Sequence, residues 1–144
     1  MKNQVINAVL HATTLMKDLS FDTINSFHYW RHNLRGNRVR KNYFLHDSKH
    51  PPVVLIQGFM GTRGVLVPLE NHLRSLGRDV FSIDLGFFNV SDIRNSAQIL
   101  SYKIERLIDR FQDVHGFEKI HVIGHSMGGL IGLYYLKKLG GHRV

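Results

Sequence analysis

A serine at the centre of a glycine-bounded pentapeptide is the clearest candidate for chemistry in this chain. Residues 124–128 read Gly-His-Ser-Met-Gly, with an apolar run at 120–123 before them and a second apolar stretch, 130–139, after them. The pattern G-x-S-x-G between a strand and a helix needs its glycines, because the serine backbone is strained and flanking side chains would collide. We therefore predict that the hydroxyl of Ser126 is presented at a sharp turn above the end of a strand.

A serine hydroxyl attacks a carbonyl only with help from other groups. A histidine must take its proton, a carboxylate must orient that histidine, and hydrogen-bond donors must stabilise the oxyanion. One predicted donor is the backbone N–H of Met127, at the start of a helix whose dipole also favours negative charge. The second is the N–H of Phe59, in the loop 58–61 that reads Gly-Phe-Met-Gly. Loss of one such donor typically lowers the rate by about 10²–10³.

Short apolar runs predict the strands that position these residues. They lie at 53–56, 80–83 and 119–123. Amphipathic helices are predicted between them, over about 66–76 with Gly77 as a left-handed cap, and from about 91 to 116. Residues 130–139 read as the helix that follows the serine. This alternation of strands and helices specifies an α/β fold with a parallel sheet and right-handed crossovers.

The first fifty residues are richer in positive charge than the rest. They hold eight Lys or Arg against three Asp, within a chain of net charge +8. Apolar spacing predicts an amphipathic helix over 4–19, and a loose alternation predicts an edge strand over 38–45. We expect residues 1–50 to pack on the core and residues 51–144 to form a partial catalytic domain. The aromatic residues around the basic segment 31–41 are expected to face inward: Phe27, Tyr29, Trp30, Tyr43 and Phe44.

Composition excludes several classes of protein and site. The 144 residues, 43% of them hydrophobic, are enough for one sizeable core. The absence of cysteine excludes disulfide scaffolds, cysteine-ligated metals and cysteine nucleophiles. No metal-ligand or phosphate-loop pattern occurs, so we expect no metal and no cofactor. The beginning of the chain is too polar for a signal-peptide core, which favours a cytoplasmic location.

Two other roles are possible for the first fifty residues besides packing on the core. The predicted helix over 4–19 could attach the protein to the periphery of a membrane, although its polar face carries few cations. The basic segment 31–41, with its neighbouring aromatic residues, could contact RNA or anionic lipid headgroups. Runs of charge like this more often belong to solvated surface segments than to binding sites. We therefore expect no nucleic-acid partner.

The loop and the serine turn together resemble the α/β-hydrolase family. Within it, the chain is most similar to bacterial lipases and esterases related to triacylglycerol lipases and to the lipid-remodelling inositol deacylases. The likeness is carried by residues 53–61 and 122–130 and by the helix between them. It implies a three-layer α/β/α core, Ser126 as nucleophile, Phe59 and Met127 as the oxyanion hole, and an acyl ester or lipid as substrate. Many relatives have histidine where this chain has Gln57, and glutamine can also hydrogen-bond the loop.

The resemblance also sets an expectation about the remaining catalytic residues. In this family the acid and the histidine follow the nucleophile on later strands, and 18 residues follow Ser126 here. We therefore expect an amino-terminal fragment, with a sheet that is incomplete on its C-terminal side and residues 140–144 turning toward a further strand. Of the groups present, we expect His121 and His125 to be structural and His142 to lie at the end of the sheet opposite Ser126. Asp84 follows the second strand and could line a pocket at this edge of the sheet, but without a histidine beside it we expect it to cap a helix or to bond its own loop.

Several functional hypotheses stay open at this point. The first is a serine hydrolase that acts on carboxylic esters through an acyl-enzyme on Ser126, with the acid and histidine of the triad missing from this chain. The second is a catalytically inactive hydrolase-fold protein that serves as a binding module, with the segment 31–41 facing an anionic partner. In the third, another chain supplies the acid and the histidine. The sequence does not predict the oligomeric state.

Overall fold

The chain forms two compact units, of which the second contains the sheet. A computed structural model of the protein describes residues 27–28, 30–34, 36, 50–86, 91–115 and 118–144, with the backbone alone at 111–115. The units are Met1–Arg31 and His32–Val144. The predicted helix over 4–19 and the predicted strand over 38–45 lie outside the described residues. The packing of residues 1–50 on the core therefore stays a prediction.

The expectation that the aromatic residues near the basic segment face inward is wrong for two of them. Phe27 and Trp30 are 66% and 58% exposed. Both belong to the first unit, whereas the buried apolar clusters are built by residues of the second. Tyr29, Tyr43 and Phe44 lie outside the described residues.

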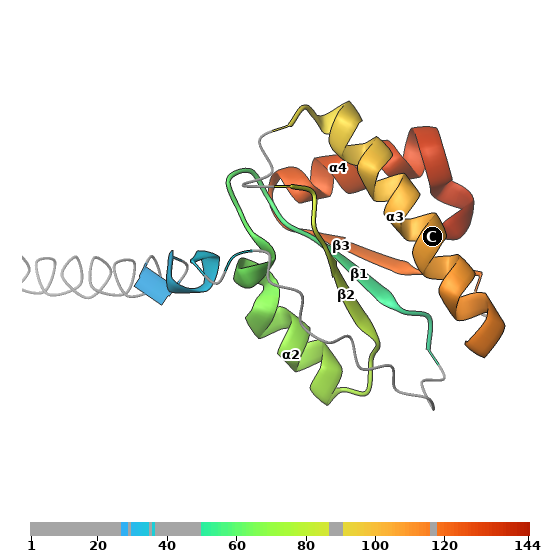
Figure 1. Ribbon diagram of the computed structural model, residues 1–144, viewed down its shortest axis with the longest axis horizontal. Coiled ribbons are helices and arrows are strands. Elements are labelled where there is room, and N and C mark those ends of the chain that lie inside the picture. The colour runs from blue at the N-terminus through green and yellow to red at the C-terminus, as the bar shows by residue number, and fades with distance from the viewer. Residues whose placement is uncertain (1–26, 29, 35, 37–49, 87–90, 116–117) are drawn as a thin grey trace, which may run out of the picture. The chain divides into compact units, whose positions relative to one another are not determined.

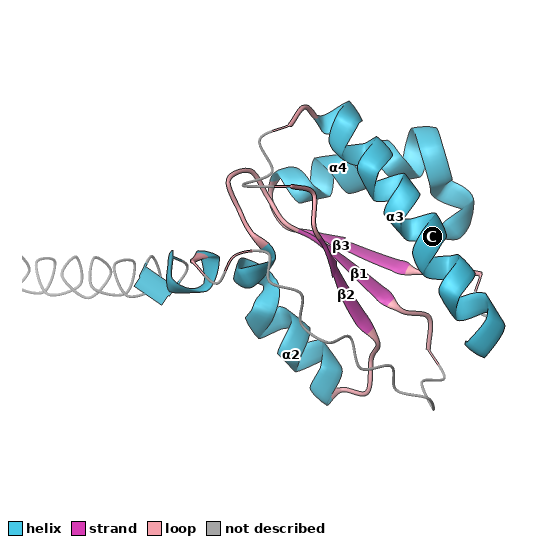
Figure 2. Cartoon of the chain, in the orientation of Figure 1, coloured by secondary structure: helices cyan, strands magenta, loops and turns pink. Residues whose placement is uncertain are grey.

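Three parallel strands form the sheet, drawn in magenta in Figure 2. They are β1 (Val53–Ile56), β2 (Val80–Ile83) and β3 (His121–Gly124), in the order β2-β1-β3. All four residues of the central strand β1 are buried. Apolar runs of this kind are typical of parallel strands covered on both faces. The predicted parallel α/β fold is confirmed, with β3 starting two residues later than expected.

Helices cover both faces of this sheet, which confirms the three-layer arrangement. The helix α2 (Val67–Ser75), preceded by the 3₁₀ turn η1 (Arg63–Leu66), lies on one face, and α3 (Ile93–His115) and α4 (Met127–Tyr135) lie on the other (Figure 1). Successive side chains of β1 alternate between these layers. The larger cluster holds Val54 and Ile56 together with buried residues of α3 and α4. The smaller cluster holds Val53 and Leu55 together with Leu66 and Val80.

The ends of the helices follow the local chemistry of the sequence. Gly77 adopts φ +75°, the left-handed conformation predicted for it after α2. At the start of α3, the Asp92 carboxylate accepts a hydrogen bond of 2.6 Å from the N–H of Arg94, which satisfies a free amide of the first turn. Beyond α4 the chain continues as a π-helix, Leu136–Gly140, and a 3₁₀ turn, Gly141–Arg143, where we predicted a turn toward a strand.

The outer edge of β3 has no partner strand among the described residues. Three of its four residues are exposed, including Ile123. The carbonyl of Arg143 accepts a hydrogen bond of 2.7 Å from the N–H of Ile120, so the 3₁₀ turn lies at the amino end of this strand. Among the described residues, no helix is both long and apolar enough to cross a bilayer.

Burial of Tyr135, at the end of α4, is expected to make the free energy of unfolding fall at alkaline pH. Burial, together with the charge of Glu105, raises the pKa of Tyr135 from 10.0 to about 12, although nearby Arg143 opposes the shift. The folded protein therefore holds this proton at a pH where the unfolded chain has lost it. The stability contributed by the Tyr135 proton is fully present below about pH 10 and is lost as the pH rises toward 12.

We expect Tyr135→Phe to remove this alkaline loss of stability. The substitution should cost little at neutral pH, since the hydroxyl has no hydrogen-bond partner within the described part of the chain. Urea unfolding at about pH 8 and about pH 11 tests this, with the adjacent, half-buried Tyr134→Phe as the control. The same drop in stability in wild type and in Tyr135→Phe would contradict the assignment.

Candidate functional site

Ser126 lies at the sharp turn between β3 and α4, as predicted. Its backbone has φ 54° and ψ −126°, and its side chain is exposed. A positive φ is uncommon in a residue with a Cβ atom and costs about 1–3 kcal/mol, so the surroundings must hold it. Hydrogen bonds do so on both sides: His125 N–H donates to Ile56 O (2.9 Å), and Gly128 N–H donates to His125 O (2.9 Å).

Glycines on either side of Ser126 allow the turn to close. A Cβ atom on Gly124 would lie 2.4 Å from the carbonyl oxygen of Gly128. A Cβ atom on Gly128 would lie 2.4 Å from the carbonyl oxygen of Ile56. Both contacts involve backbone atoms that cannot rotate away. The steric reason given for the two glycines of the motif is therefore confirmed.

The loop that carries Phe59 lies directly against this turn. A Cβ atom on Gly58 would approach the Cβ of Ser126 to 2.9 Å, so only a glycine lets the two segments come this close. The loop folds back through a hydrogen bond of 3.1 Å from Gly61 N–H to Gly58 O. Met60, at its tip, has φ 52°. The structure thus brings the Phe59 loop to Ser126, at the carboxyl ends of β1 and β3, the edge where α/β sheets bind ligands.

Met127 is the first residue of α4 and follows Ser126 directly. Its N–H therefore lies at the amino terminus of a helix, where unpaired amides and the helix dipole favour an anion. The side chains of Phe59 and Met60 are 54% and 50% exposed beside it on the loop. The three residues predicted for the site, Ser126, Phe59 and Met127, are all placed at this one edge.

The other titratable candidates are placed elsewhere or have a local role. Asp84 accepts a hydrogen bond of 2.8 Å from Gly86 N–H, so of the two roles expected for it, capping a helix or bonding its own loop, the structure shows the second. His121 begins β3, and His142 lies in the 3₁₀ turn beside the same end, opposite Ser126. His125 is exposed within the turn itself. Among the described residues, no group of three or more His, Asp or Glu could hold a metal ion.

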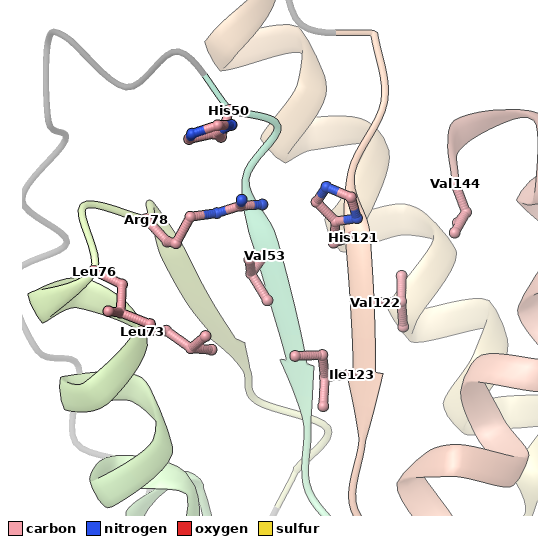
Figure 3. A pocket seen from close by; sticks show the side chains of 9 residues that line it. All are labelled: His50, Val53, Leu73, Leu76, Arg78, His121, Val122, Ile123 and Val144. Atoms are coloured by element: carbon pink, nitrogen blue, oxygen red, sulfur yellow. The ribbon is translucent and has the colours of Figure 1, made fainter.

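A hollow of about 570 Å³ opens at the far end of the sheet (Figure 3). It is lined by His50, Val53, Leu73, Leu76, Arg78, His121, Val122, Ile123 and Val144. Since Val53 and His121 are the first residues of their strands, the hollow lies around the amino ends of β1 and β3. Its lining continues along β3 as far as Ile123 and does not include Ser126, Phe59 or Met127.

Asn33 also belongs to the site and was not predicted from the sequence. It is buried and makes three hydrogen bonds to Met60 and Thr62, the residues that follow Phe59 in the loop and its continuation. No motif includes it, because its partners lie 27 and 29 positions further along the chain. A buried asparagine requires hydrogen-bond partners, but the sequence does not show that Asn33 is buried.

Comparison with known proteins agrees with this geometry. The profile of the alpha/beta hydrolase fold family matches residues 51–144, which is more than half of the chain. The matched region contains the three strands, the loop 58–61 and the serine turn. The family indicates hydrolase chemistry in general. The chain belongs to the alpha/beta hydrolase fold family.

Proposed function

We propose that this protein is a serine hydrolase of carboxylic esters, of the lipase and esterase type, with Ser126 as its nucleophile. The observation that carries the proposal is that Ser126 has a strained backbone and an exposed side chain and lies against the glycine of the Phe59 loop. Such strain persists only where the surroundings impose it, and it is often found where it serves a mechanism. The N–H groups of Phe59 and Met127 are the proposed donors to the oxyanion.

The proposed reaction has two steps. The Ser126 oxygen attacks the ester carbonyl, its proton passes to a base, and the alcohol leaves with a proton, so that an acyl-enzyme remains. Water then attacks the acyl-enzyme and releases the carboxylic acid, which restores the serine. We propose that the acid and histidine that drive both steps are missing from these 144 residues and are supplied by another segment or another chain.

An apolar acyl group is the substrate part that the surface near Ser126 fits best. Phe59 and Met60 expose apolar side chains on the loop, and Leu130 does so in the first turns of α4. Burial of an acyl chain against such side chains is favourable by about 0.8 kcal/mol per CH₂ group. The same surface would suit contact with a lipid interface, which supports the proposed lipase and esterase activity.

Acylation by an activated ester tests this proposal. We expect p-nitrophenyl butyrate to add one butyryl group to the protein, seen by intact mass and localised to Ser126 by peptide mapping. The p-nitrophenolate group of this ester leaves readily and the proposed oxyanion donors stay in place, so slow acylation of Ser126 should be detectable without the triad acid and histidine. Ser126→Ala should abolish the adduct, and the exposed Ser91→Ala should not. Acylation confined to lysines, equal in Ser126→Ala, would refute the proposal.

A non-catalytic binding module is the second candidate. The exposed edge of β3 favours it, because unpaired N–H and C=O groups of an edge strand can pair with another chain. On this account Ser126 is a packing element with no enhanced reactivity. The acylation experiment separates the two candidates, since only a hydrolase nucleophile reacts selectively with the ester.

A further inference from the structure

The side-chain amide of Asn33 bridges two backbone groups of the loop beside Ser126. Its Oδ1 accepts a hydrogen bond of 2.7 Å from Thr62 N–H, and its Nδ2 donates one of 3.2 Å to Met60 O. The Thr62 hydroxyl in turn donates to the backbone carbonyl of Asn33, at 2.8 Å. Asn33 is 5% exposed and Thr62 2% exposed, so the two bonds between these residues are shielded from water, and the bond to Met60 is partly so. All of these residues belong to the unit His32–Val144.

The loop needs support of this kind. Its Met60 has a left-handed backbone, which disfavours a residue with a Cβ atom. Phe59 and Met60 are half exposed, so packing of their side chains contributes little to holding the loop in place. The hydrogen bond from Gly61 N–H to Gly58 O closes the turn on itself but does not tie it to the rest of the unit.

An asparagine side chain is suited to this task. Its amide presents one acceptor and one donor side by side, as a backbone peptide does, and here it pairs with a backbone N–H and a backbone C=O two residues apart. Aspartate would keep the acceptor but place a second oxygen against the Met60 carbonyl. Alanine would leave the buried Thr62 N–H and the partly buried Met60 C=O without this partner, and the cost is larger for the buried group.

We propose that Asn33 is a positioning residue for the oxyanion hole, because it fixes Met60 and Thr62 and thereby aims the N–H of Phe59 at the site of the oxyanion. The inference rests on the proposed function of Ser126. Asn33 itself does not touch the substrate. Its contribution is to hold the loop in the orientation required for the reaction, since a shift of about 1 Å in such a group can lower a rate about 10²-fold.

The first test compares reaction rates at Ser126. We expect Asn33→Ala to lower the rate of Ser126 modification by a fluorophosphonate about 10²-fold relative to wild type. The matched control is Asn95→Ala, an exposed asparagine in the first turn of α3. Thermal unfolding of each variant shows whether the fold is retained. An Asn33→Ala protein that is folded and reacts at the wild-type rate would overturn the inference.

Asn33→Asp gives a readout that a purely structural role would not produce. When protonated, the aspartic acid can donate to Met60 O in place of the amide, whereas the carboxylate cannot. Burial favours the neutral form, so the ratio of the Asn33→Asp rate to the wild-type rate should rise as the pH is lowered. Asn95→Asp should show a constant ratio. A ratio for Asn33→Asp that does not change with pH while the carboxyl group titrates would count against positioning through the Met60 carbonyl.

Hydrogen exchange at Thr62 keeps this inference separate from the proposed function. The Thr62 amide, bonded to Asn33, should be protected in wild type and should lose protection in Asn33→Ala, while amides of β1 keep theirs. If wild type does not react at Ser126, the proposed function fails, and Thr62 exchange still decides whether Asn33 holds the loop. An unchanged Thr62 exchange rate in Asn33→Ala would overturn the inference whatever the reactivity of Ser126.

Discussion

Replacing Gly128 by alanine is expected to lower the free energy of unfolding by about 3 kcal/mol. The added Cβ would lie 2.4 Å from Ile56 O and 2.8 Å from Gln57 O. These are backbone atoms at the end of the central strand, so relief of the clash requires α4 to move away from β1. Such a movement would open the turn that presents Ser126 and would expose residues of the larger apolar cluster, among them Ile131.

The neighbouring Gly129→Ala is the matched control for this prediction. A Cβ atom there meets only Gly124 O, at 3.6 Å, which is an ordinary contact. Alanine is also more favourable than glycine within a helix by about 0.5–1 kcal/mol, so this variant should be as stable as wild type or more so. Equilibrium unfolding in urea measures both. Equal stability of the two alanine variants would show that the close approach of α4 to β1 is wrong.

Gly58→Ala is expected to lower the rate of Ser126 modification about 10²-fold. The new Cβ would lie 2.9 Å from the Cβ of Ser126 and 3.0 Å from His125 O. Either the Phe59 loop or the serine must therefore shift, and the distance between the proposed oxyanion donor and the nucleophile changes. Gly58 is buried, but the next two residues, Phe59 and Met60, are exposed, so the loop can shift outward and the loss of stability should be smaller than in Gly128→Ala.

The rate of fluorophosphonate modification, measured together with urea unfolding, tests the Gly58 prediction. Gly129→Ala again serves as the control, because it adds a Cβ atom near the same turn without a close contact. A folded Gly58→Ala protein that reacts as fast as wild type would mean that the Phe59 loop takes no part in the reaction at Ser126.

Much of the fold followed from apolar runs and glycines. The strand over 53–56 was predicted with its observed ends, because four buried residues between a proline pair and Gln57 allow little else. Gly77 was placed correctly as a left-handed cap, since only a residue without a Cβ atom adopts φ +75° at no steric cost. The turn at Ser126 was predicted because its glycines are a local steric requirement.

Features set by tertiary contacts were missed or wrongly predicted. Asn33 bonds a loop that lies 27 to 29 positions away, and no local pattern encodes that distance. Phe27 and Trp30 were expected to face inward on the grounds of their apolar character alone, yet they are exposed. The π-helical extension of α4 through Gly140 was also not foreseen, since residues 130–139 read as one regular helix.

The central claim is that Ser126 is a nucleophile, and the site of covalent modification tests it most directly. The protein would be treated with a fluorophosphonate and digested, and the modified peptide identified by mass spectrometry. We predict one phosphonyl group on Ser126, absent from Ser126→Ala and retained in Ser91→Ala. Modification spread over other side chains, with Ser126 left unmodified, would contradict the account.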